Sequence, residues 1–240
     1  MGAAEEKREP AGRVAMISGA SRGIGAAVAR ELARRGWKLS LGMREPVRPG
    51  WTDDDAAHVF PYDATDPAAE ERWVAAAGGF HGRIDAVIAN AGIMIPKSVI
   101  EAEDGDLDRL FEVNVKAPRR LVKAAWEMLA ASGRGRVMIL ASLSGKRVKS
   151  AKSGSYAVSK FAAVALSHAI RQAGWDFGIR ATAVCPGFVA TDMARAITDR
   201  KDGEMIPPGA LATVIATLLD LPNEASVAEF AVNCQLEEFF

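Results

Sequence analysis

The chain has 240 residues, of which 49% are hydrophobic and 25% charged, and this balance is typical of a folded globular protein. Its 30 Lys and Arg residues match its 30 Asp and Glu residues, so no net charge attracts it to nucleic acid or to an anionic membrane. The charged first ten residues do not form a signal peptide, and no stretch contains the roughly 20 apolar residues that cross a bilayer. The two cysteines and three histidines are scattered. We therefore expect a cytoplasmic protein that binds no metal, no nucleic acid and no membrane.

Short apolar runs alternate with longer helical patterns along the chain. Most runs are continuous, which is typical of strands that are covered on both faces. We predict strands at Arg13–Ser18, Lys38–Met43, His58–Tyr62, Ala86–Asn90, Arg136–Ala141, Ile179–Cys185 and Glu229–Asn233. We predict helices at Gly25–Arg35, Asp66–Ala77, Leu107–Ala131, Ser155–Gly174 and Pro208–Leu219. Because such alternation indicates βαβ units, the sequence predicts a doubly wound α/β fold, with a seven-stranded, mostly parallel sheet and helices on both faces.

Local signals suggest where one helix begins and where another is missing. Asp66 is expected to cap the second helix, and Gly78-Gly79 to end it. The stretch between Met43 and His58 has no helical pattern, so we expect a loop where a parallel crossover usually carries a helix. No shift in composition divides the chain. We therefore expect a tail at residues 1–12 and a single domain at 13–240.

A glycine-rich turn joins the first predicted strand to the first helix. Its glycines stand at the first, fifth and seventh positions of the segment from Gly19 to Gly25. A tight strand-to-helix turn needs residues that accept a positive φ, and a phosphate must approach backbone N–H groups at the positive end of the helix. In this context the spacing predicts a dinucleotide site formed by Gly19, Ser21, Arg22, Gly23, Ile24 and Gly25.

The end of the second strand is expected to select the dinucleotide. Arg44 stands at that point and Arg22 lies in the glycine loop, and two guanidinium groups suit a 2′-phosphate. Glu45 could instead turn inward and bind a free ribose hydroxyl. We favour NADP(H) over NAD(H) as the cofactor.

Tyr156 and Lys160 are four residues apart near the start of a predicted helix, so they share one face. An ammonium about 4 Å from a phenol in a shielded cleft can lower the phenol pKa by about 3 units. The pair would then serve as an acid–base catalyst near neutral pH. Taken alone, this spacing more often belongs to an ordinary helix surface, and only the accompanying motifs favour the catalytic interpretation.

In combination, these motifs resemble the short-chain dehydrogenase/reductases in their short, single-domain form. The match extends from about Arg13 to Met193. Its motifs, in order, are the glycine loop Gly19–Gly25, Asn90-Ala91-Gly92, Asn114, Ser142, Tyr156-x-x-x-Lys160 and Pro186-Gly187. The resemblance implies a Rossmann fold and an NAD(P)-dependent oxidoreductase that interconverts a carbonyl and a secondary alcohol by hydride transfer.

The resemblance also implies roles for single residues. Tyr156 would give a proton to the substrate carbonyl in reduction, and Lys160 would hold the nicotinamide ribose and lower the Tyr156 pKa. Ser142 would hydrogen-bond the substrate oxygen, with Ser144 as a weaker candidate. Asn114 would bind a water that passes protons to Lys160, unless it bonds its own helix backbone. Further cofactor contacts are implied at Asp63, Ala64, Asn90, Ala91, Gly92, Pro186, Gly187, Val189 and Thr191.

The substrate itself is less well defined than the chemistry. We expect a small-molecule carbonyl or alcohol, lined by Ile93, Met94, Phe188, Met193 and the loop 146–155, under a short lid at about 188–208. One residue more than usual separates Ser142 from Tyr156, and we place it in that loop. The loop carries Lys146, Arg147, Lys149 and Lys152, which either draw an anionic substrate or form an ordinary exposed surface.

Relatives of this kind pair through two long helices, here Leu107–Ala131 and Ser155–Gly174, so we expect a homodimer or homotetramer. The terminal Phe239-Phe240 either docks on a neighbouring subunit or frays. Two other functions remain open. One is a cofactor-binding sensor or scaffold of the same fold, and the other is epimerase or dehydratase chemistry at the same site.

Overall fold

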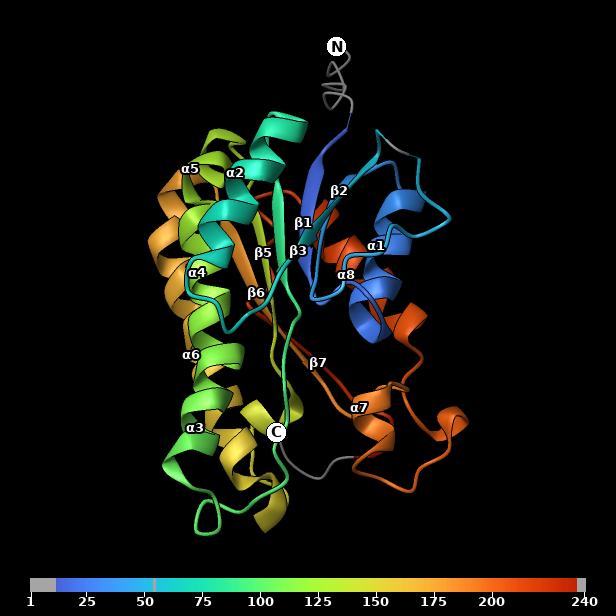
Figure 1. Ribbon diagram of the computed structural model, residues 1–240, viewed down its shortest axis with the longest axis vertical. Helices are drawn as coiled ribbons and strands as arrows, with labels where there is room; N and C mark the ends of the chain where they lie inside the picture. Colours follow the sequence, from blue (N-terminus) through green and yellow to red (C-terminus); the bar gives the residue numbers. More distant parts are fainter. Residues whose placement is uncertain (1–11, 54, 237–240) are drawn as a thin grey trace, which may run out of the picture.

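The computed structural model describes residues 12–53 and 55–236. Its seven strands form one sheet in the order β3-β2-β1-β4-β5-β6-β7 (Figure 1). The strands are β1 (Val14–Ser18), β2 (Lys38–Met43), β3 (Ala57–Pro61), β4 (Ala86–Ala89), β5 (Arg136–Leu140), β6 (Arg180–Pro186) and β7 (Glu229–Val232). The seven predicted strands are confirmed, and every pairing between them is parallel, so the sheet is parallel throughout rather than mostly so. The predicted tail, except for Gly12, and Phe239-Phe240 lie outside the described residues.

Helices cover both faces of the sheet, as predicted. Figure 1 shows α2, α4, α5 and α6 on one face and α1 and α8 on the other. The helices are α1 (Gly23–Arg34), α2 (Ala69–His81), α3 (Asp104–Phe111), α4 (Ala117–Ala124), α5 (Trp126–Ala131), α6 (Gly154–Gly174), α7 (Asp192–Arg195) and α8 (Pro208–Asp220). Each face of the sheet has its own hydrophobic core, and successive residues of β1 point into opposite ones. Met16 packs in the core beneath α2, α4 and α6, whereas Ile17 packs in the core beneath α1 and α8. This double burial explains why the strand sequences are continuously apolar.

Helix α2 differs from its predicted bounds at both ends. It begins at Ala69 rather than Asp66, because the Asp66 carboxylate accepts a hydrogen bond from the Ala68 amide in a turn that precedes the helix. It also continues through Gly78-Gly79 and ends at Gly82, whose φ of 75° is left-handed. Gly78 lies against Met128, since a Cβ there would lie 2.4 Å from Cε of that side chain. The glycine pair therefore lies within the helix and does not mark its end.

The long helix predicted at 107–131 is divided into pieces. A π turn, Glu112–Lys116, separates α3 from α4, and α5 follows α4 with a small change of direction at Ala125. Between Met43 and Ala57 the described residues contain turns but no helix, as the sequence predicts. The strand order reverses between β1 and β4, and in open parallel sheets a ligand crevice lies at the carboxyl ends of the strands at such a switch point.

Candidate active site

The ends of β1 and β4 are joined by hydrogen bonds at the switch point. The Ser18 hydroxyl accepts from the amides of Asn90 and Ala91, each at 3.0 Å. The Asn90 side-chain amide donates to the carbonyls of Ser18 at 3.0 Å and Gly19 at 3.1 Å. Asn90 therefore holds the beginning of the glycine loop against β4. Ser18 was not among the predicted site residues, although it immediately precedes the loop.

The glycine loop has the backbone geometry that its sequence predicts. Gly19 and Gly23 have φ values of 67° and 58°, which other residues rarely adopt. A Cβ on Gly25 would lie 2.3 Å from the Gly19 carbonyl oxygen, so the loop closes only on glycine. None of the described side chains caps the start of α1, and its first turn contains no acidic residue. The free N–H groups at this helix end suit the pyrophosphate of a dinucleotide.

The other residues of the loop are distributed between solvent and core. Ser21 and Arg22 are exposed, while Ile24 packs against the core beneath α1 and α8. The Arg22 guanidinium donates to the Asp192 carboxylate at 2.9 Å, across to the start of α7. Arg22 therefore already has an anionic partner within the protein.

The predicted adenosine end is formed by residues that follow β2 and β3. Arg44 and Glu45 are both exposed there, and Ala64 is buried. Hydrogen bonds from the Thr65 amide and hydroxyl, together with the nearby Arg44 charge, hold the pKa of Asp63 below its usual range. The Arg44 charge therefore acts on the Asp63 carboxylate.

Ser142, Tyr156 and Lys160 come together beyond the carboxyl end of β5. Ser142 follows that strand, and its side chain lies near enough to Tyr156 to work towards a lower pKa of the phenol. Lys160 Nζ lies 5.6 Å from the centroid of the Tyr156 ring and donates to the Leu140 carbonyl at 2.7 Å. The Ser144 amide, in turn, donates to the Ser142 hydroxyl at 3.1 Å. Ser142 rather than Ser144 therefore faces the tyrosine.

Gly145 explains how the Ser142 turn reaches α6. A Cβ at this position would lie 2.6 Å from the carbonyl oxygen of Lys160. The turn that holds Ser142 therefore lies directly on the helix backbone at Lys160. The spacing between Ser142 and Gly145 is a packing requirement of the site.

The predicted effect of Lys160 on the Tyr156 pKa is not found in the structure. Burial raises the pKa of Tyr156 to about 12, although the hydrogen bond with Ser142 works in the opposite direction. Burial also lowers the pKa of Lys160 to about 8. The prediction assumed an ammonium about 4 Å from the phenol, but Nζ points to Leu140 and lies 5.6 Å from the ring centroid. Desolvation of both groups therefore outweighs their attraction.

Asn114 lies in the π turn and is almost completely buried. Its Oδ1 accepts from the Ile93 amide at 2.9 Å, and its Nδ2 donates to the Ile93 carbonyl and to the Ser159 hydroxyl, both at 3.0 Å. It therefore bonds other elements rather than its own helix. A Cβ on Gly92 would lie 3.2 Å from Asn114 Oδ1 and 3.6 Å from Lys160 Nζ, so Gly92 lies between the two side chains. Ser159, which no motif had identified, completes this contact with α6.

The segment after β6 returns to the glycine loop. Gly187 donates its amide to the Val232 carbonyl at 2.8 Å, and Val189 is buried. Thr191 caps α7, and its methyl group would be 3.2 Å from a Cβ on Gly23. Val189 also pairs with Ile206, which closes the predicted lid segment into a loop. Pro186 to Thr191 therefore run along the crevice towards the phosphate end of the site.

The basic loop between Ser142 and Tyr156 is less positive than its sequence suggests. Lys146 forms an ion pair with Glu229 on β7, and the other oxygen of Glu229 lies 2.6 Å from Nε2 of His168. Lys149 is exposed at the surface of the loop. The Lys146 charge is therefore neutralised within the protein and does not contribute to substrate attraction.

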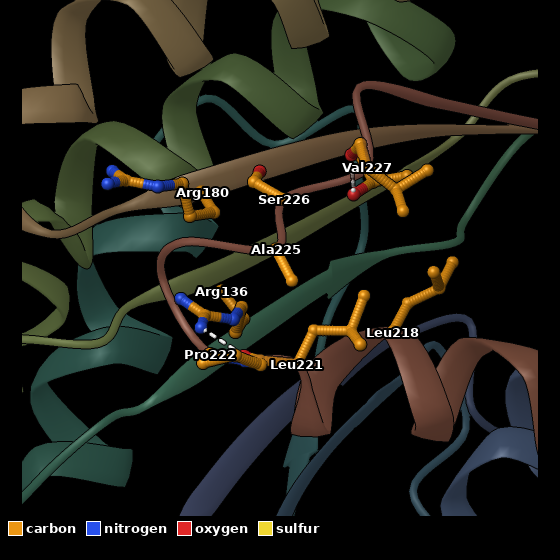
Figure 2. Close-up of a pocket in the computed structure, with 9 residues that line it drawn as sticks. Arg136, Arg180, Leu218, Leu221, Pro222, Ala225, Ser226 and Val227 are labelled. Atoms are coloured by element: carbon orange, nitrogen blue, oxygen red, sulfur yellow. Dashed lines mark hydrogen bonds between the residues drawn. The ribbon is translucent and has the colours of Figure 1, made fainter.

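A small pocket lies at the amino-terminal ends of the strands, opposite the active site, where β5 and β6 begin. Figure 2 shows it beside Arg136 and Arg180, the first residues of these strands. Arg136 donates to the Leu221 carbonyl at the end of α8, so the cluster caps that helix. Ser142 stands six positions after Arg136, beyond the other end of β5, so at about 3.3 Å per residue the two are up to about 20 Å apart. This pocket is therefore separate from the active site.

Two further findings concern metal ligands and membrane spans. Among residues 12–53 and 55–236, no three His, Cys, Asp or Glu side chains are grouped as metal ligands. Over the same part of the chain, no helix combines the length and apolar character needed to cross a membrane.

A doubly wound parallel sheet with a dinucleotide loop at its switch point places the protein among the NAD(P)-binding Rossmann oxidoreductases. The sequence profile of the short chain dehydrogenases matches residues 13–202. The chain therefore belongs to the short-chain dehydrogenase family, as its motifs predict.

Individual relatives agree with this assignment. Agropine synthesis reductase of Rhizobium rhizogenes is 35% identical over 228 residues, which are 93% of this chain and 53% of that protein. The chain thus spans about half the length of the first curated relatives that it matches. Oxidoreductase UcpA of Escherichia coli K12 is 30% identical over 91% of this chain and 84% of its own length.

Solved structures show the same fold. An alcohol dehydrogenase from the archaeon Thermococcus sibiricus, complexed with 5-hydroxy-NADP, superposes with a TM-score of 0.82 at 27% identity, over 95% of this chain and 99% of that one. The 3-ketoacyl-(acyl-carrier-protein) reductase of Brucella melitensis, complexed with NADH, gives 0.85 at 23% identity over 93% and 97% of the two chains. Both dinucleotides thus occur among proteins of this fold.

Proposed function

We propose that the protein is an NADP(H)-dependent oxidoreductase that interconverts a small-molecule carbonyl and a secondary alcohol. The proposal rests mainly on one grouping of side chains: Ser142 lies near enough to Tyr156 to lower the pKa of the phenol, and the Lys160 ammonium lies 5.6 Å from the phenol ring. Ser142 would supply a hydrogen-bond donor, Tyr156 a proton donor and Lys160 a positive charge. A substrate carbonyl oxygen placed between the two hydroxyls would be polarised by one and protonated by the other, as reduction requires.

The residues around the crevice fit a dinucleotide. The amides at the start of α1 would hold the pyrophosphate, and Arg44, with Arg22, would bind the 2′-phosphate. Asp63 and Ala64 would line the adenine, with Asn90, Ala91 and Gly92 beside it. Lys160 would hold the nicotinamide ribose, and Val189 and Thr191, after Pro186-Gly187, would meet the carboxamide. The positive φ of Gly19 and Gly23 supports this arrangement, because it brings bare backbone to the surface of the crevice.

The residues then divide the work of reduction. When bound, the cofactor supplies the hydride to the carbonyl carbon. The Ser142 hydroxyl polarises the carbonyl oxygen, and the Tyr156 hydroxyl gives that oxygen its proton. Lys160, with a pKa of about 8, is mostly protonated at neutral pH and stabilises the phenolate that remains. Asn114 holds the Ile93 backbone beside Lys160, and in oxidation each proton moves in reverse.

The test is Tyr156→Phe, assayed with a panel of ketones, aldehydes and alcohols, with NADPH and NADH, at the nicotinamide absorbance. Loss of the only acidic hydroxyl that the proposal uses should reduce turnover by about 10³-fold or more, while cofactor binding is kept. Turnover within about tenfold of the wild type would contradict the proposal. A biological function that survives this change would instead identify a cofactor sensor or scaffold.

The assembly is also a proposal. Val158 and Phe161 on α6 are each 44% exposed, three positions apart on one helix face, which supports pairing of two copies through α6. Two of the alanines in this helix, Ala157 and Ala163, are fully buried in their own subunit, so they serve internal packing instead. Phe161→Glu is expected to convert a homodimer or homotetramer to a smaller species in light scattering. An unchanged mass would exclude this face.

Two broader proposals follow from the remaining observations. The β-bridge between Val189 and Ile206 supports a substrate lid at about 188–208, and the single seven-stranded sheet supports one domain at 13–240. Cys185 and Cys234 are both free thiols, which supports a reducing, cytoplasmic location.

A further inference from the structure

Arg120 on α4 connects three parts of the chain through one side chain. Its Nε and Nη2 donate to the two carboxylate oxygens of Glu70 on α2, at 2.9 and 3.2 Å. Its Nη1 donates to Glu112, the first residue of the π turn, and Nη2 also donates to the Ala64 carbonyl at 3.0 Å. A planar guanidinium can satisfy these partners at once because its N–H groups point in several fixed directions.

The partners of Arg120 lead to both ends of the proposed active site. Ala64 belongs to the segment after β3 that would line the adenine. Glu112 opens the π turn that contains Asn114, whose side chain holds the Ile93 backbone beside Lys160. One guanidinium therefore lies between the adenosine end and the acid–base end of the crevice.

The network is buried at Glu70 and partly shielded at Arg120 and Glu112. Glu70 is fully buried and also accepts a hydrogen bond from the Tyr62 hydroxyl at 2.9 Å. Burial opposes the ionised form of Glu112, but Arg120 and Lys116 together hold the pKa of that carboxyl below its usual range. In such surroundings a bidentate Arg–carboxylate pair has a defined geometry that a lysine, as a point charge, does not reproduce.

We propose that Arg120 is a positioning residue that fixes the Asn114 turn and the Ala64 carbonyl as one rigid unit. This inference rests on the proposed function, because it assigns Ala64 to the adenosine end and Asn114 to the acid–base end. The hydrogen bond from Arg120 to Glu112 fixes the position of the π turn, whereas the hydrogen bond to the Ala64 carbonyl fixes the segment that would line the adenosine. Substitutions should therefore be able to disturb one contact without the other.

Two variants test the Arg120 contacts with Glu112 and Ala64 separately. Glu112→Gln removes the charge that anchors the π turn and leaves Arg120 paired with Glu70. Arg120→Lys keeps the positive charge but cannot reach all three partners. Glu71→Gln is the control, since Glu71 is the exposed neighbour of Glu70 on α2 and loses the same charge. The readouts are kcat with the best carbonyl substrate and NADPH, the dissociation constant for adenosine 2′,5′-bisphosphate by calorimetry, and the thermal midpoint.

The expected result is a split between these readouts. Glu112→Gln should lower kcat about three- to tenfold and leave the affinity for adenosine 2′,5′-bisphosphate within about twofold of wild type. Arg120→Lys should reduce both, by about fivefold or more each. Glu71→Gln should change neither. A role confined to folding would move the thermal midpoint without separating turnover from affinity.

Several outcomes would overturn the inference. In one, Glu112→Gln behaves like Glu71→Gln in both kcat and affinity; this variant decides the matter even if Arg120→Lys does not fold. In another, affinity and turnover fall together in Glu112→Gln. If the wild-type protein itself does not bind adenosine 2′,5′-bisphosphate, the proposed cofactor fails and this inference with it. Normal wild-type binding with variants that show no split removes the inference alone.

Discussion

Arg22 of the glycine loop and Asp192 at the start of α7 lie 2.9 Å apart, although 170 positions separate them in the sequence. The pair is largely exposed, so it contributes at most about 1 kcal/mol to stability. The pair matters for cofactor binding, because the same guanidinium is a proposed ligand of the cofactor 2′-phosphate and the Asp192 carboxylate would compete with that phosphate. Asp192 and that phosphate are two anions that Arg22 could bind, and Asp192 lies in the proposed lid.

Asp192→Asn should therefore favour the phosphorylated cofactor. Without its carboxylate partner, Arg22 is free for the 2′-phosphate, and the KM for NADPH should fall about two- to fivefold while the KM for NADH stays unchanged. Asp202→Asn is a matched control, because Asp202 is an equally exposed carboxylate of the proposed lid that shares Arg195 with Asp192 but pairs with Arg195 rather than with Arg22. Equal changes in both KM values would show that Arg22 does not contact the phosphate.

Arg44→Ala should have the larger effect on cofactor choice. Loss of a charge-assisted contact to the 2′-phosphate is expected to raise the KM for NADPH by about 10- to 100-fold and to leave NADH nearly unaffected. Arg119→Ala, an exposed arginine on α4, serves as the control for net charge. If the wild-type protein prefers NADH, the preference for NADP(H) is wrong and Glu45 becomes the candidate ribose ligand.

Gly145→Ala should damage the site through packing alone. The new Cβ would lie 2.6 Å from the Lys160 carbonyl, a backbone atom that cannot move aside cheaply. We expect the free energy of unfolding to fall by about 1–3 kcal/mol and kcat to fall with it, because the Ser142 turn must shift away from α6. In contrast, Gly79→Ala meets no atom within 4 Å inside α2 and should raise stability by up to about 1 kcal/mol. Urea unfolding measures both, and a neutral Gly145→Ala would show that the turn is not tightly packed.

Lys160→Met should stabilise the protein while it abolishes turnover. Burial lowers the Lys160 pKa to about 8 from an ordinary value of 10.5, so the folded protein binds a proton there less readily than the unfolded chain. At neutral pH this disfavours the folded wild-type protein. The free energy of unfolding of Lys160→Met should therefore be about 1–2 kcal/mol higher than that of the wild type, after the loss of the Leu140 hydrogen bond is included.

The pH dependence of this difference has a definite sign. Below pH 8, lysine is protonated in both states and its penalty is constant. As pH rises from 8 towards 10.5, the folded protein loses that proton first, so wild-type stability increases and its deficit relative to Lys160→Met shrinks. Urea unfolding at pH 7 and pH 9.5 measures the two values. A constant difference would mean that Lys160 titrates normally in the folded protein.

Local patterns in the sequence were enough to predict most of the fold. The continuous apolar runs gave the strands, because parallel strands are buried on both faces, and the glycine spacing gave the loop, because few residues accept a φ near 60°. Properties that depend on distant partners were not predictable. The Lys146 charge is cancelled by Glu229, 83 positions away, and the direction of the Tyr156 pKa is decided by burial that spacing within one helix cannot reveal. Asp66 fails as a helix cap for a local reason: its carboxylate is used in a turn before the helix.

The π turn at Glu112–Lys116 determines where this chain tolerates insertions and deletions. A π turn holds one residue more than an α-helical turn for the same full rotation, so deletion of one residue there would restore a regular helix and leave α4 in its present phase. Asn114 lies inside that turn, however, and would be displaced from its contacts with Ile93 and Ser159, while Arg120 would still face α2. By contrast, the helix-free link between β2 and β3 lies at the surface, and changes in its length leave these contacts intact. Natural or engineered variation in length should therefore be accepted in the link and rejected in the turn.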